Sequence, residues 1–260
     1  LAAADAARTS RCRAVIAIDP FGLAVASRAV TEFAAAHALA LIDDAACGLG
    51  AVDEDGCAGG SYGVLATLSF HPRKVITTGE GGAIVCDDPT LAAALRAIRN
   101  QGQRGRGDFV RPGANARLPE TAAAIGAVQL GRLDAMLAER RLLAAGYHDR
   151  LETDRAAGRL DWQTVAGAAR HTWQTFGVVL APGADRDEVM ARLDTAEIEA
   201  APLTFALGRL GAFAALPGVA GRLTPVADEL HQRGLALPLW LGMRSEQLDR
   251  VCDILRRVLP

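Results

Sequence analysis

The sequence predicts an α/β fold with a mostly parallel β-sheet and flanking helices. The apolar run AVIAI at residues 14–18 ends at Asp19-Pro20, which is typical of a strand followed by a turn. Residues 25–37 have apolar positions at a helical spacing, and a second apolar run, ALALI, follows at 38–42. A strand, a helix and a strand at this spacing form a βαβ unit, in which the two strands run parallel.

Further segments extend this pattern towards the middle of the chain. We expect a third strand at 64–70, two β runs within 75–88 joined by a turn at Gly79–Gly82, and a helix at 91–99. Residues 119–153 are strongly helical in composition, so we expect two helices or one long bent helix there.

The C-terminal part predicts a smaller α+β domain. A strand is expected at 173–180, and a helix near 186–194 is expected to begin at a cap provided by Asp185. A last helix carries its apolar residues on one face: Leu248, Val251, Cys252, Leu255 and Leu259. We therefore expect a large domain at 1–145 and a small domain at 146–260.

Composition and charge narrow the possible functions. The chain has 28 basic and 30 acidic residues and no basic stripe, which argues against binding to nucleic acid. No apolar run reaches the roughly 18 residues that a membrane span needs. The five cysteines are scattered, without the spacing of zinc ligands, so we expect neither disulfides nor a structural metal. These features favour a small-molecule enzyme or a protein-binding module in the reducing cytoplasm.

Lysine usage is the sharpest compositional feature. Of the 28 basic residues, only Lys74 is a lysine. Arginine replaces lysine in salt bridges and on solvated surfaces, but it stays protonated, whereas a buried lysine amine can deprotonate and attack a carbonyl. Either one lysine has survived by chance, or it is retained for amine chemistry.

Two other residues near Lys74 match one kind of chemistry. Pyridoxal phosphate (PLP) needs an amine for a Schiff base, a carboxylate facing its pyridine nitrogen, and donors for its phosphate. Lys74 can supply the amine, Asp44 at the end of a predicted strand the carboxylate, and Ser69 a hydroxyl. Taken singly, Asp44 could instead cap the next segment or pair with an arginine, and Ser69 could be an ordinary strand hydroxyl.

Three segments resemble one enzyme family. They are LIDDAACGLGA at 41–51, SFHPRKVITTGEGGAIVCDD at 69–88 and GANARLPETAAAIGAVQLGRLDAMLAERR at 113–141. In these segments the chain is similar to the DegT/DnrJ/EryC1/StrS family of fold-type I, PLP-dependent aminotransferases, which act on nucleotide-linked keto sugars. The resemblance runs from near Val15 to the C-terminus, and its central segment is highly specific.

The resemblance implies a role for each of five residues. Lys74 would hold PLP as a Schiff base, and Asp44 would face the pyridine nitrogen. Cys47 would pack at the cofactor ring, and Ser69 would contact the phosphate. Asn115 matches an asparagine that reaches the phosphate of the neighbouring subunit's cofactor, so the resemblance also implies a homodimer with shared active sites. The first of the two expected domains would then be the PLP-binding domain.

The chain also departs from the family pattern. Cys47 replaces a glutamine or histidine, and Ala116 replaces an aromatic residue. Family members further have an N-terminal segment with a Gly-Thr phosphate-binding turn, so we expect this chain to be a truncated copy.

The implied reaction is the transfer of an amino group from an amino acid, with glutamate as donor, to a keto sugar linked to a nucleotide. Related sugar dehydratases carry histidine in place of the lysine, so Lys74 favours transfer over dehydration. The departures leave a second hypothesis open, a catalytically inactive remnant or pseudo-enzyme that acts as a binding or structural protein. A dinucleotide site at Gly48-Leu49-Gly50 is not supported, because no third glycine completes the fingerprint.

Overall fold

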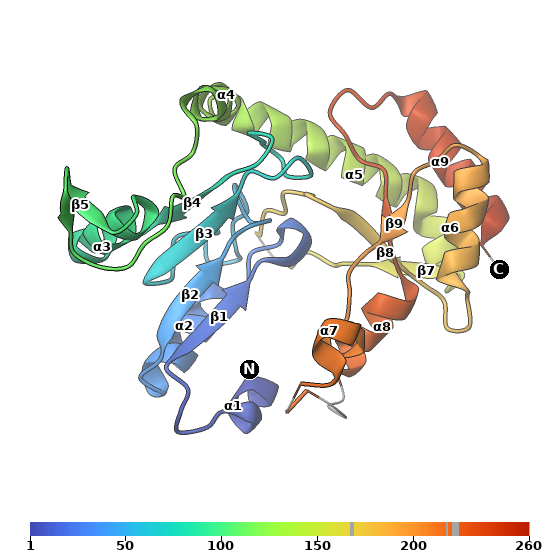
Figure 1. Cartoon of the computed structure of the whole chain (residues 1–260). Coiled ribbons are helices and arrows are strands. Elements are labelled where there is room, and N and C mark those ends of the chain that lie inside the picture. Colours follow the sequence, from blue (N-terminus) through green and yellow to red (C-terminus); the bar gives the residue numbers. More distant parts are fainter. Residues whose placement is uncertain (167–168, 217, 220–223, 260) are drawn as a thin grey trace. The chain divides into compact units, whose positions relative to one another are not determined.

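The chain folds into two units, each with its own four-stranded sheet (Figure 1). The computed structural model describes residues 1–166, 169–216, 218–219 and 224–259. Unit 1 comprises Leu1–Ala138 and Val165–Gln174, and unit 2 comprises Glu139–Thr164 and Thr175–Pro260. Among the helices of the described residues, none combines the length and apolar character that crossing a bilayer requires.

The elements of unit 1 are, in chain order, α1 (Ala2–Ala7), β1 (Ala14–Ile18), the 3₁₀ turn η1 (Pro20–Gly22), α2 (Ser27–Ala36), β2 (Ala40–Asp44), β3 (Leu65–Ser69), β4 (Gly82–Val85), α3 (Pro89–Arg99), β5 (Gln103–Gly105), β6 (Asp108–Phe109) and α4 (Glu120–Leu130). Helix α5 (Leu133–Ala156) begins in unit 1 and continues into unit 2. The elements of unit 2 are β7 (Leu160–Trp162), β8 (Phe176–Leu180), α6 (Arg186–Thr195), β9 (Ala201–Pro202), the 3₁₀ turn η2 (Leu207–Arg209), α7 (Gly211–Ala214), α8 (Pro225–Arg233), β10 (Gly234–Leu237) and α9 (Ser245–Val258).

The predicted mostly parallel sheet is confirmed in unit 1. Strands β1, β2 and β3 are parallel neighbours, and β4 adds to β3 in the antiparallel sense. Strand β2 is longer at its C-terminal end than we expected, because Asp43 and Asp44 continue the register with β1. The two helices expected within 119–153 are α4 and α5.

One predicted strand does not form. The residues at 75–78 were expected to be a β run, but they close a loop instead. The backbone N–H of Thr78 and the hydroxyl of Thr77 both donate to the carbonyl of Phe70, at 3.0 and 2.9 Å. The N–H of Thr78 and the carbonyl of Phe70 are thereby not free for a β ladder, and the antiparallel partner of β3 begins only at Gly82.

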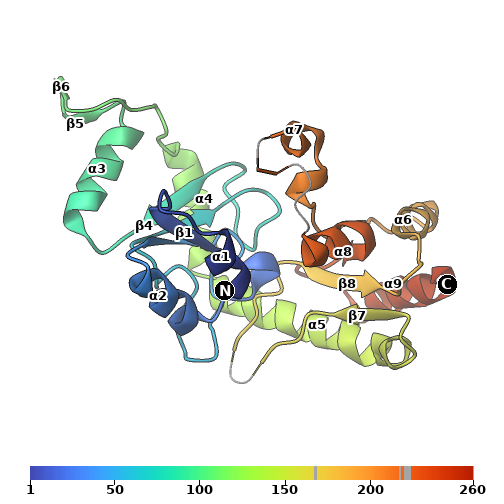
Figure 2. The ribbon, with the colours of Figure 1, turned by 90° about the horizontal axis from the view of Figure 1, so that it is seen from below.

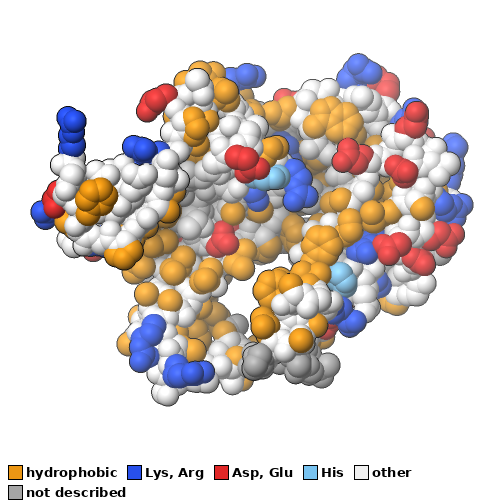
Figure 3. Space-filling view, viewed as in Figure 1, with side chains coloured by type: hydrophobic (Ala, Val, Ile, Leu, Met, Phe, Trp, Pro, Cys, Tyr) orange, Lys and Arg blue, Asp and Glu red, His pale blue; other side chains and the backbone are white. Residues whose placement is uncertain are grey.

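The two faces of the unit 1 sheet differ in what covers them. Helix α2 packs on one face (Figure 2). Ala17, Leu41 and Ala34 form a small core there. Figure 3 shows hydrophobic side chains exposed over the unit 1 sheet. On the face opposite α2, the exposed apolar side chains of β1 and β4 include Ile18 and Ile84. Because side chains alternate along a strand, this exposed face also carries the side chain of Asp44.

Unit 2 has an antiparallel sheet in the order β7-β8-β10-β9. Phe176 of β8 is fully buried, and its ring stacks on Tyr147 of α5 with centroids 4.6 Å apart. The strand expected at 173–180 forms only from Phe176, as β8. Asp185 accepts hydrogen bonds from backbone N–H groups in the first turn of α6, as predicted. The expected apolar face of α9 is buried, although Leu259, which is also buried, follows the last residue of the helix.

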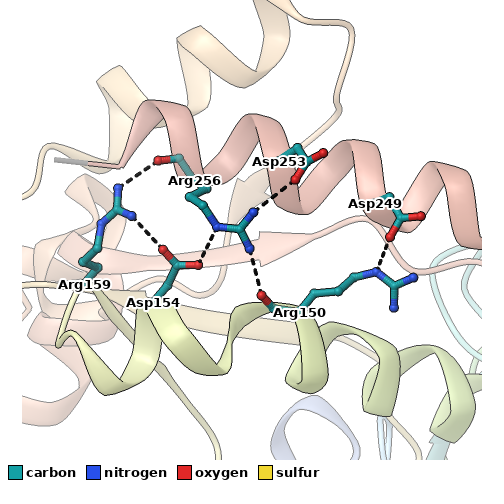
Figure 4. Close-up of polar contacts among 6 residues, drawn as sticks. All are labelled: Arg150, Asp154, Arg159, Asp249, Asp253 and Arg256. Carbon is teal, nitrogen blue, oxygen red and sulfur yellow. Dashed lines mark hydrogen bonds and ion pairs between the residues drawn. The ribbon is translucent and has the colours of Figure 1, made fainter.

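A network of ion pairs joins α5 and α9 in unit 2 (Figure 4). The buried carboxylate of Asp154 pairs with Arg159 at 2.7 Å and with Arg256 at 3.1 Å. Arg256 also pairs with Asp253 at 3.0 Å, and Arg150 pairs with Asp249 at 2.6 Å.

Candidate active site

Two adjacent strands of the unit 1 sheet each have a polar residue at the C-terminal end. Asp44 is the last residue of β2 and Ser69 the last residue of β3, and these strands run parallel. Both side chains therefore lie at the edge of the sheet where ligands bind in open α/β folds. Asp43 does not join them, because it is fully buried on the face that packs on α2.

Lys74 lies in the loop between β3 and β4, residues 70–81, which we call the lysine loop. Its Nζ donates a hydrogen bond to Sγ of Cys47 at 3.0 Å. Cys47 belongs to the turn that follows β2 and Asp44. The structure thus brings the amine of the single lysine to the strand end that carries the Asp44 carboxylate.

Two glutamines that the sequence did not reveal anchor the lysine loop. Oε1 of Gln129 accepts from the backbone N–H of Thr77 at 3.1 Å, and its Nε2 donates to the Thr77 carbonyl at 2.5 Å. Nε2 of Gln174 donates to the carbonyl of Arg73 at 2.9 Å. The backbone on either side of the lysine is therefore held by side chains from distant parts of unit 1.

The carboxylate of Asp44 is held by two donors. The hydroxyl of Thr67 on β3 donates to Oδ1 at 3.2 Å, and the backbone N–H of Ala46 donates to the same oxygen at 3.2 Å. The sequence reading missed Thr67, although its position two residues before Ser69 places it on the same face of the strand.

A second pair of carboxyls lies beneath this site. Asp19 accepts from the Tyr62 hydroxyl and the Val25 N–H, both at 3.0 Å, and Asp43 accepts from the Gly60 N–H at 2.6 Å. Within the described residues, Oδ2 of Asp19 and Oδ1 of Asp43 have no hydrogen-bond partner. Burial raises the pKa of Asp19 to about 6, with a further contribution from the charge of Asp43, and burial also raises the pKa of Asp43.

Asn115 is not brought to this group. Its Oδ1 accepts from Nε of Arg117 at 3.2 Å, and its backbone forms an isolated bridge with Asn100. In the part of the chain that the structure describes, no hydrogen bond joins it to Lys74 or Asp44.

The residues at the strand ends fit PLP. Lys74 supplies a partly buried amine, and Ser69 supplies a hydroxyl at the end of β3. Both donors that reach Asp44 within the described residues bond to Oδ1. Its Oδ2 is therefore available to a cofactor nitrogen.

Comparison with known proteins identifies the family of this chain. The family model of the DegT/DnrJ/EryC1/StrS aminotransferases matches residues 1–256. GDP-perosamine synthase of Caulobacter vibrioides is 34% identical over 98% of this chain and 68% of its own length. The dTDP-3-amino-3,4,6-trideoxy-alpha-D-glucose transaminase of Micromonospora megalomicea subsp. nigra is 33% identical over the same shares. The chain thus spans about two thirds of the length of these relatives.

The fold has close counterparts among solved structures. The crystal structure of S. venezuelae DesV in complex with a ketimine intermediate has a TM-score of 0.88 and is 31% identical, covering 98% of this chain and 67% of that chain. Fold and site together define a fold-type I aminotransferase whose cofactor is PLP. The chain belongs to the DegT/DnrJ/EryC1/StrS aminotransferase family.

Proposed function

We propose that this protein transfers an amino group from an amino acid, with glutamate as donor, to the carbonyl carbon of a nucleotide-linked keto sugar. The observation that carries the proposal is the contact between Nζ of Lys74 and Sγ of Cys47, which holds the only lysine at the strand end of Asp44. The nucleotide-sugar names of the relatives support the substrate class. In this proposal unit 1 is the PLP-binding domain.

Each site residue has a distinct task in the proposed reaction. PLP supplies an electron sink conjugated to the reacting carbon when it is bound. Lys74 would hold the cofactor, and its amine would take up and return the proton of the donor's α-carbon, as general base and then general acid. Asp44 would hold the ring nitrogen protonated, Ser69 would bind the phosphate, and Cys47 would pack at the ring.

A non-catalytic binding protein is not favoured. A remnant without amine chemistry would have no use for a lysine in a chain that otherwise uses arginine for every basic side chain. The relatives named above are called a perosamine synthase and a transaminase, and the contact of the Lys74 amine with Cys47 supports retained amine chemistry.

Reductive trapping tests the proposal. The protein is mixed with PLP and reduced with borohydride, and peptide mass spectrometry then locates the pyridoxyl group. The N-terminal amine is the only competing amine in the chain, because Lys74 is the only lysine. We expect the adduct at Lys74, and we expect Lys74→Arg to lose it although the positive charge remains. An adduct confined to the N-terminus, or transamination that survives in Lys74→Ala, would contradict the proposal.

The proposal includes a homodimer with shared active sites. None of the residues of α4 is buried, and the exposed side chains include Ile125 and Val128. Asn115 stays apart from the other proposed site residues, as a residue directed at a second copy would. Light scattering should show dimers that Val128→Glu converts to monomers. Val226→Glu is the matched control, because Val226 has the same 68% exposure. A monomeric wild-type protein would contradict this part.

We place the reaction in the cytoplasm. The five cysteines are free thiols, the state that a reducing compartment maintains. Fractionation of the native host with a thiol-trapping reagent would test this assignment, and recovery in an oxidising compartment would contradict it.

A further inference from the structure

One row of side chains crosses the exposed face of the unit 1 sheet. The strand registers pair Ile18 with Asp44, Asp44 with Thr67, and Thr67 with Ile84. These four residues therefore lie side by side, with two isoleucines flanking a carboxylate and a hydroxyl. The isoleucines cannot donate hydrogen bonds, so Thr67 is the neighbour in this row that can bind Asp44.

The bond from Thr67 selects one of the two carboxylate oxygens. Oδ1 of Asp44 accepts from the Thr67 hydroxyl and from the Ala46 N–H, both at 3.2 Å. Two donors on one oxygen fix the rotation of the carboxylate about its Cβ–Cγ bond. In the described part of the chain, Thr67 is also the only side chain that donates to Asp44. The other oxygen, Oδ2, is left for a ligand.

We propose that Thr67 is a positioning residue, which turns Oδ2 of Asp44 towards the ring nitrogen of bound PLP. The inference rests on the proposed role of Asp44. Without the hydroxyl, Ala46 alone would hold the carboxylate, which could then rotate and share its charge with water. Thr67 thus acts on the cofactor only through Asp44, so its effect requires the ring nitrogen to be present.

That requirement gives a specific test. Dissociation constants are measured by fluorescence for PLP and for its carbocyclic analogue, in which a CH group replaces the ring nitrogen. Thr67→Val keeps the shape and removes the hydroxyl, and Thr67→Ser restores the hydroxyl. Thr90→Val, on the exposed first turn of α3, is the matched control. Thermal unfolding of each variant monitors folding.

We expect Thr67→Val to weaken PLP binding about tenfold, as for one hydrogen bond to a charged group, and to leave binding of the analogue unchanged. Thr67→Ser and Thr90→Val should bind both compounds as the wild type does, within about twofold. An equal loss for both compounds, or no loss for PLP, would overturn the inference while the proposed function stands. A wild-type protein that fails to bind PLP would overturn both.

Discussion

The partners of buried aspartates differ between the two units. In unit 2, the Asp154 carboxylate lies between the guanidinium groups of Arg159 and Arg256. In unit 1, Asp19 and Asp43 are equally buried, but the groups that bond to them are backbone N–H groups and the hydroxyl of Tyr62. Neutral donors leave the charge of a buried carboxylate uncompensated, whereas arginine compensates it.

The two kinds of partner have different consequences for the buried carboxylates. Unit 2 uses its ion pairs to join α5 to α9, which is a structural task. Among the described residues of unit 1, no ion pair joins an arginine to Asp19 or Asp43. Raised carboxyl pKa values are the physical cost of that arrangement.

Removing the shared carboxylate in unit 2 should have the largest effect. Asp154→Ala leaves two guanidinium groups without their common partner, and we expect the free energy of unfolding to fall by about 3 kcal/mol. Urea titration at pH 7 measures it. Asp253→Ala is the control, because Asp253 pairs with the same Arg256 but its side chain is 58% exposed, and it should cost less than about 1 kcal/mol. Equal losses would break the comparison.

Neutralising a carboxyl in unit 1 should have the opposite sign at neutral pH. The pKa of Asp19 is about 6 in the fold against an ordinary value of 3.8, so the folded state binds this proton more tightly than the unfolded chain. Stability from Asp19 is therefore complete below pH 4 and is lost as the pH rises through 6, by up to about 3 kcal/mol. Asp19→Asn cannot ionise and should escape this loss.

Stability curves from pH 4 to pH 7 check this expectation. As the pH rises, the free energy of unfolding of Asp19→Asn should increase relative to that of the wild type. The exposed Asp87→Asn should run parallel to the wild type over the same range. If Asp19→Asn also ran parallel, the contrast between the two units would lose its electrostatic basis.

Loss of a helix N-cap should lower the free energy of unfolding by the same amount in both units. This is the smallest expected effect. Asp88 accepts two backbone N–H bonds at the start of α3, and Asp185 does so at the start of α6. Replacing either by Ala should lower the free energy of unfolding by about 1 kcal/mol, and replacement by Asn should cost little. Denaturant titration of the four variants measures this, and clearly unequal Ala costs would mean that the units differ in more than tertiary partners.

The elements that local patterns encode were predictable from the sequence. Strand β1 has the predicted bounds, and the buried face of α9 follows from its apolar spacing. The run VITT at 75–78 has strand-forming residues, but its backbone N–H groups bond to the Phe70 carbonyl and the Gln129 side chain instead. Propensity cannot anticipate such tertiary partners.

The candidate site also contains residues that the sequence could predict and residues that it could not. Lys74 and Asp44 stand out by residue type and by resemblance, and their roles stay predictions until they are tested. Thr67 is 23 positions from Asp44 and Gln129 is 52 positions from Thr77, so these pairs meet only through strand register and tertiary folding. A single sequence carries no local signal for such contacts.

The anchored lysine loop has a thermodynamic consequence. Fixing the backbone of one residue costs about 1–2 kcal/mol of conformational entropy. Gln129 and Gln174 hold the loop on both sides of Lys74 through bonds that lie within the chain itself. Folding therefore meets the ordering cost of the backbone on both sides of Lys74 in advance, and a ligand that binds at this loop does not have to supply that cost from its own affinity.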